Sequence, residues 1–120
     1  MKFFERIIYV SKLLKENCFS VSSSQYKPGS DPASGWYRIK SKRNSWYIVI
    51  TEFISNGLII KYSYVLLKNK VLIMRYDNAP HHRKISTYPH HKHLEDKVFP
   101  VEKWSIEAFI REALDIISRK

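Results

Sequence analysis

The chain has 120 residues, of which 44% are hydrophobic and 14% aromatic, so it can form one modest core and is not expected to be disordered. Its 21 lysines and arginines outnumber 11 acidic residues, and the formal charge of +10 indicates an anionic partner: nucleic acid, an acidic protein or a membrane surface. The single cysteine, Cys18, excludes an internal disulfide, and no apolar run approaches the roughly 18 residues of a membrane span. We therefore expect one soluble, cytoplasmic domain over residues 1–120, with no membrane partner.

The first predicted element is a helix over residues 2–16. Its apolar residues recur at helical spacing: Phe3, Ile7, Val10 and Leu14. We expect this stripe to cover a sheet, although a basic amphipathic helix also suits a membrane surface or a partner's groove. Residues 20–35 are rich in Ser, Pro and Gly, which predicts a loop, with a short strand at its start as an alternative.

Four segments rich in Ile, Val, Tyr and Trp follow: residues 35–42, 45–54, 58–67 and 70–77. The connections between them read RN, SNG and KN, which suits hairpins, so we predict an antiparallel meander of four strands, or five with the short strand before it. Lys61 and Ser63 alternate with Tyr62 and Tyr64, as in a sheet with one solvated face.

A last helix is predicted after residue 105, where Ser105 can cap its start and Glu107 lies in its first turn. Its apolar residues share one face: Ile106, Phe109, Ile110, Ala113 and Ile117. The expected fold class is α+β, an antiparallel sheet of four to five strands with an N-terminal and a C-terminal helix packed on it.

Residues 75–93, RYDNAPHHRKISTYPHHKH, contain every histidine of the chain: His81, His82, His90, His91 and His93. Pro80 and Pro89 each precede a His-His pair, and each proline fixes its own φ and restricts the residue before it. Five histidines, four of them in two matched Pro-His-His repeats, indicate a functional site rather than an ordinary surface loop.

One chemistry that suits these histidines is metal-free cleavage of RNA. Histidine titrates near neutrality, so two imidazoles can act as base for the 2′-hydroxyl and acid for the leaving 5′-oxygen. Arg75, Arg83 and Lys92 can stabilise phosphate charge, and Asp77 can orient an imidazole. Asn78 is a turn former that we include among the substrate-binding candidates.

The other chemistry is metal binding. If HHKH is extended, His91 and His93 point to one face and His90 to the other. Such a pair can bind Zn²⁺, with His81 or His82 and Asp77 completing a catalytic site. Because the spacing matches no strong zinc signature, we expect no cofactor and keep a divalent metal as the alternative.

Three polar residues of the predicted strands have two interpretations each. Glu52 lies in an otherwise apolar strand, so it either faces solvent or points toward the histidines as a base or orienting group. Tyr62 and Tyr64 share a face and either stack on nucleotide bases or pack within the core.

The two histidine blocks, RYDNAPHH and ISTYPHHKH, resemble the TumE-like family of toxin components from prokaryotic toxin–antitoxin systems. That family has an Arg-aromatic-Asp-Asn-Ala-Pro-His-His block followed by Thr-aromatic-Pro-His-His-Lys-His. TEFI, KYSYVLL and SIEAFIREALDII also resemble its strands and closing helix, so the match covers about residues 45–117. Tyr76 and Tyr88 replace the tryptophan and phenylalanine common there and keep the aromatic character.

The resemblance implies a small toxin made beside a cognate antitoxin protein that silences it. RelE-like toxins of similar size and outline are often ribonucleases, which is an analogy of fold class. We therefore expect a toxin that binds and cleaves RNA through acid–base histidines. The alternatives are a metal-dependent nuclease or phosphodiesterase at the same residues, and a non-enzymatic protein that binds nucleic acid or an antitoxin.

Overall fold

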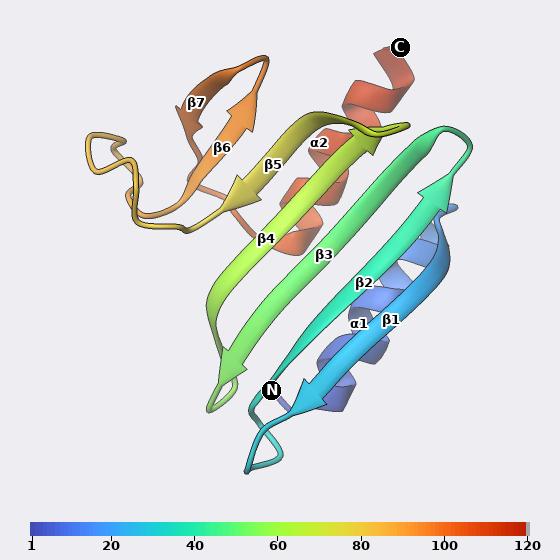
Figure 1. Ribbon diagram of the computed structural model, residues 1–120, viewed down its shortest axis with the longest axis vertical. Helices are drawn as coiled ribbons and strands as arrows, with labels where there is room; N and C mark the ends of the chain where they lie inside the picture. Colours follow the sequence, from blue (N-terminus) through green and yellow to red (C-terminus); the bar gives the residue numbers. More distant parts are fainter. Residues whose placement is uncertain (120) are drawn as a thin grey trace.

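The computed structural model describes residues 1–119 as one sheet with two helices on one of its faces (Figure 1). The helices are α1 (Phe3–Glu16) and α2 (Ile106–Arg119). The strands are β1 (Ser20–Pro28), β2 (Gly35–Arg43), β3 (Trp46–Ser55), β4 (Leu58–Lys68), β5 (Val71–Asp77), β6 (His91–Leu94) and β7 (Lys97–Pro100). In Figure 1 both helices lie behind the sheet, α1 behind β1 and β2 and α2 behind β4 and β5.

The seven strands lie in chain order, and every neighbouring pair is antiparallel. The α+β class, the terminal helices and the central meander are therefore as predicted. Asn44, Asn56 and Asn69 adopt positive φ in the hairpins before β3, β4 and β5, a conformation that asparagine tolerates better than most residues. The last hairpin, between β6 and β7, has Glu95 and Asp96 at φ 52° and 61°.

The predicted number of four to five strands is wrong, because the sheet has seven. The Ser-rich residues 20–28 form the full edge strand β1, whose polar side chains are exposed on both faces and so carry no apolar alternation. Strands β6 and β7 have four residues each, and a Glu-Asp turn joins them. Strands this short, without a Gly or Asn turn, leave little periodic signal.

The core lies between the helices and the sheet. On α1, Phe3, Val10 and Leu14 are buried as predicted, and Ile7 is half-buried. On α2 the buried residues are Ile106, Phe109, Ile110, Ala113 and Ile116, and the predicted Ile117 is only partly buried. Ser105 Oγ accepts a hydrogen bond from the Ala108 backbone N–H (3.1 Å), which confirms the predicted cap.

Glu52 neither faces solvent nor points toward the histidines, so both expectations for it are wrong. It is fully buried between the sheet and α1. Its carboxylate accepts two hydrogen bonds from Arg6 (both 2.8 Å) and one from each hydroxyl of Tyr37 and Tyr64. Four donors offset the cost of burying the charge. Burial, followed by the Glu52 charge, raises the pKa of both tyrosines well above its usual range, so both hydroxyls keep their protons. This network fixes α1 on the sheet.

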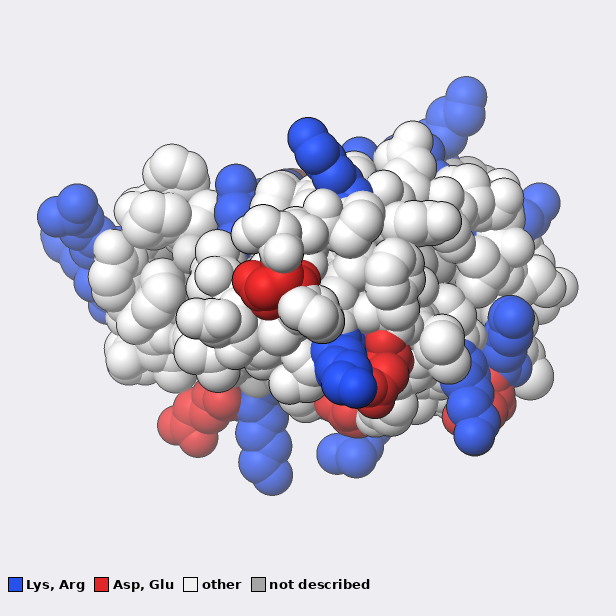
Figure 2. Space-filling model, turned by 90° about the horizontal axis from the view of Figure 1, so that it is seen from below, with Lys and Arg blue, Asp and Glu red and all other residues white. Residues whose placement is uncertain are grey.

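Neither helix covers the opposite face of the sheet, which we call the open face (Figure 1). Strand alternation places side chains such as Arg38, Lys40 and Lys61 on it, exposed to solvent. Figure 2 views the molecule from its lower end with the open face uppermost, and blue side chains project there. Neither helix within residues 1–119 has the length and apolar character needed to cross a membrane.

Candidate functional site

The candidate site forms where β5 pairs with β6. Asp77 lies directly opposite His91, and Arg75 directly opposite His93. Residues opposite each other in an antiparallel pair share a face, so all four side chains lie on the open face. The histidine run is extended as expected, with His91 and His93 on one face.

Asp77 lies at the centre of this group and is only 6% exposed. Its Oδ1 accepts a hydrogen bond from the Ala79 backbone N–H (2.9 Å) and lies 3.0 Å from Nε2 of His91. Its Oδ2 accepts a hydrogen bond from Nε of Arg75 (2.9 Å) and lies 3.6 Å from Nε2 of His93. One carboxylate therefore holds the guanidinium and both strand histidines in place.

His91 is anchored at both ring nitrogens. Its Nδ1 donates a hydrogen bond to the carbonyl of Pro89 (2.8 Å), and its Nε2 faces Asp77. The side chain is 2% exposed. With both nitrogens engaged and the ring buried, His91 is placed to support its neighbours rather than to touch a substrate.

His93 is the more accessible strand histidine, with a side chain 24% exposed. Nη2 of Arg75 lies 3.3 Å from its Nε2, and since arginine only donates, this hydrogen bond requires an unprotonated Nε2. Burial, followed by the positive charge of Arg75, lowers the pKa of His93. Both effects favour the neutral imidazole near pH 7.

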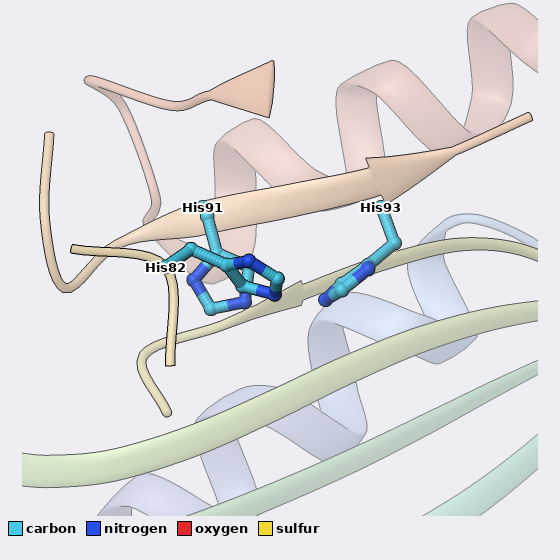
Figure 3. A group of neighbouring side chains, drawn as sticks. All are labelled: His82, His91 and His93. Carbon is cyan, nitrogen blue, oxygen red and sulfur yellow. The ribbon is translucent and has the colours of Figure 1, made fainter. Parts of the chain in front are cut away.

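His82 reaches the strand histidines from the loop that follows β5 (Figure 3). Its ring centroid lies 4.8 Å from that of His91 and 5.5 Å from that of His93, and the latter two are 4.9 Å apart. The ring is partly exposed. We call His82, His91 and His93 the histidine cluster.

The histidine cluster also has the composition of a metal site. Within residues 1–119, one nitrogen of each ring lies within 4.8 Å of the others. The Pro89 carbonyl fixes the His91 ring through Nδ1, as outer-shell carbonyls do for metal-bound histidines. Against this fit, a cation would lie beside the Arg75 guanidinium, which already bonds Nε2 of His93. The donors thus fit zinc by type, while the neighbouring charge opposes it.

His90 points to the helix side of the sheet instead of joining the cluster. Its ring stacks on Trp104 with centroids 4.6 Å apart and planes 5° apart, and its Nδ1 lies 3.0 Å from the Tyr62 hydroxyl. Burial, followed by the charge of His91, lowers the pKa of His90. Sequence reasoning missed Trp104, whose place before α2 carries no signal of this contact.

Three predicted substrate-binding residues also lie on the helix side. Tyr62 is 2% exposed and stacks on Trp104, and Tyr64 is fully buried with its hydroxyl on Glu52. Lys92 donates to the carboxylate of Glu112 on α2, with a shortest distance of 2.8 Å. The structure does not bring these side chains to the histidine cluster.

The remaining predicted residues lie near the cluster in the chain. Asn78 links two strands, because its Oδ1 accepts from the Tyr62 backbone N–H (3.0 Å) and its Nδ2 donates to the Ile60 carbonyl (3.1 Å). His81 and Arg83 are exposed on either side of His82. Neither residue belongs to the histidine cluster, although both are next to His82 in the chain.

Comparison with known protein families finds a match. The model of the family described as Toxin TumE matches residues 10–120, which include every residue of the site. No curated protein and no solved structure matches the chain.

Proposed function

Because this chain belongs to the toxin TumE family, we propose that it is a growth-inhibiting toxin that acts by cleaving RNA at the histidine cluster. The observation that carries this proposal is the meeting of three imidazoles with Arg75 and Asp77 on the open face. These groups supply acid, base and positive charge, which cleavage of a phosphodiester by its own 2′-hydroxyl requires. The family implies an antitoxin partner, and an RNA target places the action in the cytoplasm.

His93 is the proposed base. Its unprotonated Nε2 accepts the proton of the 2′-hydroxyl once Arg75 turns from this nitrogen to the substrate phosphate. The 2′-oxygen then attacks phosphorus. The Arg75 guanidinium stabilises the charge that develops on the non-bridging oxygens.

His82 is the proposed acid, because it is the other accessible ring of the cluster. It donates a proton to the 5′-oxygen as the bond between phosphorus and that oxygen breaks. The products are a 2′,3′-cyclic phosphate and a 5′-hydroxyl end. Proton transfer by positioned side chains of this kind contributes typically about 10²–10⁴-fold to the rate.

His91 and Asp77 are positioning residues in this scheme. Both side chains are buried, and their contact links β5 to β6 directly. Asp77 also bonds Arg75, so one carboxylate sets the distance between the base and the phosphate-binding cation.

Induced expression tests the proposal, with growth and the ends of cellular RNA as readouts. Wild-type protein should arrest growth and produce RNA ends with 2′,3′-cyclic phosphates, while His93→Ala should do neither. The purified protein should cleave the same RNA in excess EDTA. Growth arrest by His93→Ala, or arrest with intact RNA in the wild type, would remove ribonuclease action as the cause.

A metal-dependent nuclease is the second candidate, and the separation of the three ring nitrogens favours it. His82, His91 and His93 would hold the ion, and a metal supplies a hydroxide nucleophile at neutral pH. Such a hydroxide does not need the 2′-hydroxyl. Cleavage that EDTA abolishes, that Zn²⁺ or Mn²⁺ restores and that tolerates a 2′-deoxy substrate would identify this mechanism.

A further inference from the structure

The open face of the sheet presents exposed basic side chains and partly exposed aromatic ones, and rows of its residues lead across the strands to the histidine cluster. We propose that this face binds single-stranded RNA and guides it into the cluster. The inference rests on the proposed function, since it names how the substrate of that site is held.

One row of side chains crosses the open face from β2 to β6. Its members are directly opposite one another on successive strands: Arg38, Thr51, Ser63, Asp77 and His91. Nε of Arg38 donates to Oγ1 of Thr51 (3.1 Å), which holds the guanidinium over the face. The row crosses four spacings between neighbouring strands, so its two ends are roughly 19 Å apart.

A second row runs beside the first. It consists of Lys40, Val49, Val65, Arg75 and His93. Both rows start at an exposed cation on β2 and end at a cluster histidine, and the residues between them on β3 and β4 are small. A polymer can therefore lie close to these strands along its path from the β2 cations to the cluster.

Aromatic residues flank the first row. Trp36 and Phe53 are directly opposite each other, with ring centroids 6.0 Å apart, and Nζ of Lys61 lies 5.4 Å from the centre of the Phe53 ring. Both rings are partly exposed. Aromatic rings beside cations are the combination that holds unpaired bases and their phosphates, because each base can stack on a ring.

The charge distribution fits this occupant. Five of the 11 acidic residues lie on the two helices, away from the open face: Glu5, Glu16, Glu107, Glu112 and Asp115. Within residues 1–119, Lys40 and Lys61 form no salt bridge, so their charges are available to phosphates. In Figure 2 the red side chains lie at the centre and along the lower border, below the open face.

A single strand suits this face better than a duplex. Stacking on Trp36 or Phe53 requires an unpaired base, and an RNA duplex exposes none along its length. Attack by the 2′-hydroxyl also needs a backbone free to align with the leaving oxygen. The RNA recognised is therefore single-stranded, with little dependence on its sequence.

Equilibrium binding of a fluorescein-labelled single-stranded RNA, followed by anisotropy on the cleavage-inactive His93→Ala chain, tests the proposal. Adding Arg38→Glu and Lys61→Glu should raise Kd by about tenfold or more. The slope of log K against log salt, which is negative, should decrease in magnitude by about 1.4. The matched control is Lys12→Glu with Lys15→Glu, two exposed cations of α1 that should leave Kd and the slope unchanged.

Two further variants show whether the effect depends on reversing the charges, and a folding check accompanies each variant. Arg38→Gln with Lys61→Gln should give a weaker change in the same direction, and circular dichroism checks that each chain is folded. Phe53→Ala should weaken binding of the single-stranded RNA. In a separate comparison, the parent His93→Ala chain should bind a duplex of the same sequence more weakly than it binds the single strand.

Equal effects of the open-face and α1 pairs would overturn the inference, as would duplex binding as tight as that of the single strand. Cleavage by the otherwise wild-type chain separates the two claims. If open-face variants bind and cleave normally while His93→Ala fails to cleave, the proposed function stands and the RNA path is wrong. If the parent binds through the open face but the wild-type chain cleaves no RNA, the path stands and ribonuclease action is wrong.

Discussion

Nε2 of His91 lies 3.0 Å from Oδ1 of Asp77, and the two residues are directly opposite each other on β6 and β5. The register of the sheet therefore brings together the two chemical types of the site, imidazole and carboxylate. The same register places Arg75 opposite His93. A shift by one residue would turn both histidines toward α2 and bring Lys92 to the open face.

Replacing Asp77 by Asn should destabilise the protein and disrupt the site. The carboxylate is 6% exposed and accepts from Arg75 and the Ala79 backbone, while an amide offers one acceptor oxygen in place of two. We expect a loss of about 1–3 kcal/mol in the free energy of unfolding, measured in urea. Asp115→Asn, at an exposed position of α2, is the control and should change the free energy of unfolding by less than about 0.5 kcal/mol. Equal stability of the two variants would show that Asp77 does not hold the site together.

Arg75→Gln should move the acid limb of the pH–rate profile to higher pH. Burial and the Arg75 charge lower the pKa of His93, so the neutral base persists below the usual histidine range. Removing the cation raises this pKa, and the rate then rises with pH over a higher interval. The measurement is kcat/KM of RNA cleavage between about pH 4 and pH 8, an interval that spans the titration range of histidine. Lys12→Gln on α1 should leave the limb in place, and an unmoved limb in Arg75→Gln would exclude His93 as the titrating base.

Glu52→Gln should lower the free energy of unfolding without changing the rate of RNA cleavage. The carboxylate is fully buried and bonds Arg6, whose side chain is 12% exposed. Removing one partner of a buried ion pair costs about 3–5 kcal/mol, which urea denaturation can measure. Tyr37→Phe removes one neutral donor and should cost about 0.5–1.5 kcal/mol. Since the network lies on the helix side, folded Glu52→Gln should cleave RNA at the wild-type rate, and a large loss of cleavage would contradict this separation.

Stability should fall as the pH drops below the histidine range. The pKa values of His90 and His93 are lowered in the fold, so the unfolded chain binds more protons than the folded one as the pH falls below about 6.5. The two histidines therefore contribute to the free energy of unfolding above about pH 6.5. This contribution is lost as the pH falls toward their lower pKa values in the folded state. Urea midpoints at pH 8 and pH 5, roughly either side of this range, should differ less in His90→Gln than in the wild type. An undiminished difference would show that the ring stacked on Trp104 does not contribute.

The sequence predicts the orientation of the histidines better than their partners. Period-two alternation in HHKH places His91 and His93 on one face, and this holds in β6. Alternation also places Tyr62 and Tyr64 on one face, but it does not say which face α1 and α2 cover. The two tyrosines therefore lie in the core, because the apolar stripes of both helices pack there.

Contacts between distant segments are the part that the sequence does not predict. Residues 78–90 separate the paired strands, so the spacing alone does not give the pairing of Asp77 with His91 or the approach of His82. Glu52 gave a misleading signal, since a charge inside an apolar strand is usually solvated. Its partner Arg6 lies on α1, and only tertiary packing brings the two together.

The central claim is that accessible cluster histidines cleave RNA by acid–base chemistry. Its most direct test is the cleavage rate of one single-stranded RNA in excess EDTA, compared between His93→Ala and His81→Ala. His81 is exposed, lies beside His82 in the chain and is outside the cluster, so it is a matched control. We predict that His93→Ala lowers the rate by about 10²–10⁴-fold while His81→Ala leaves it near the wild-type value. Equal rates for the two variants, or no wild-type cleavage in EDTA, would contradict the account.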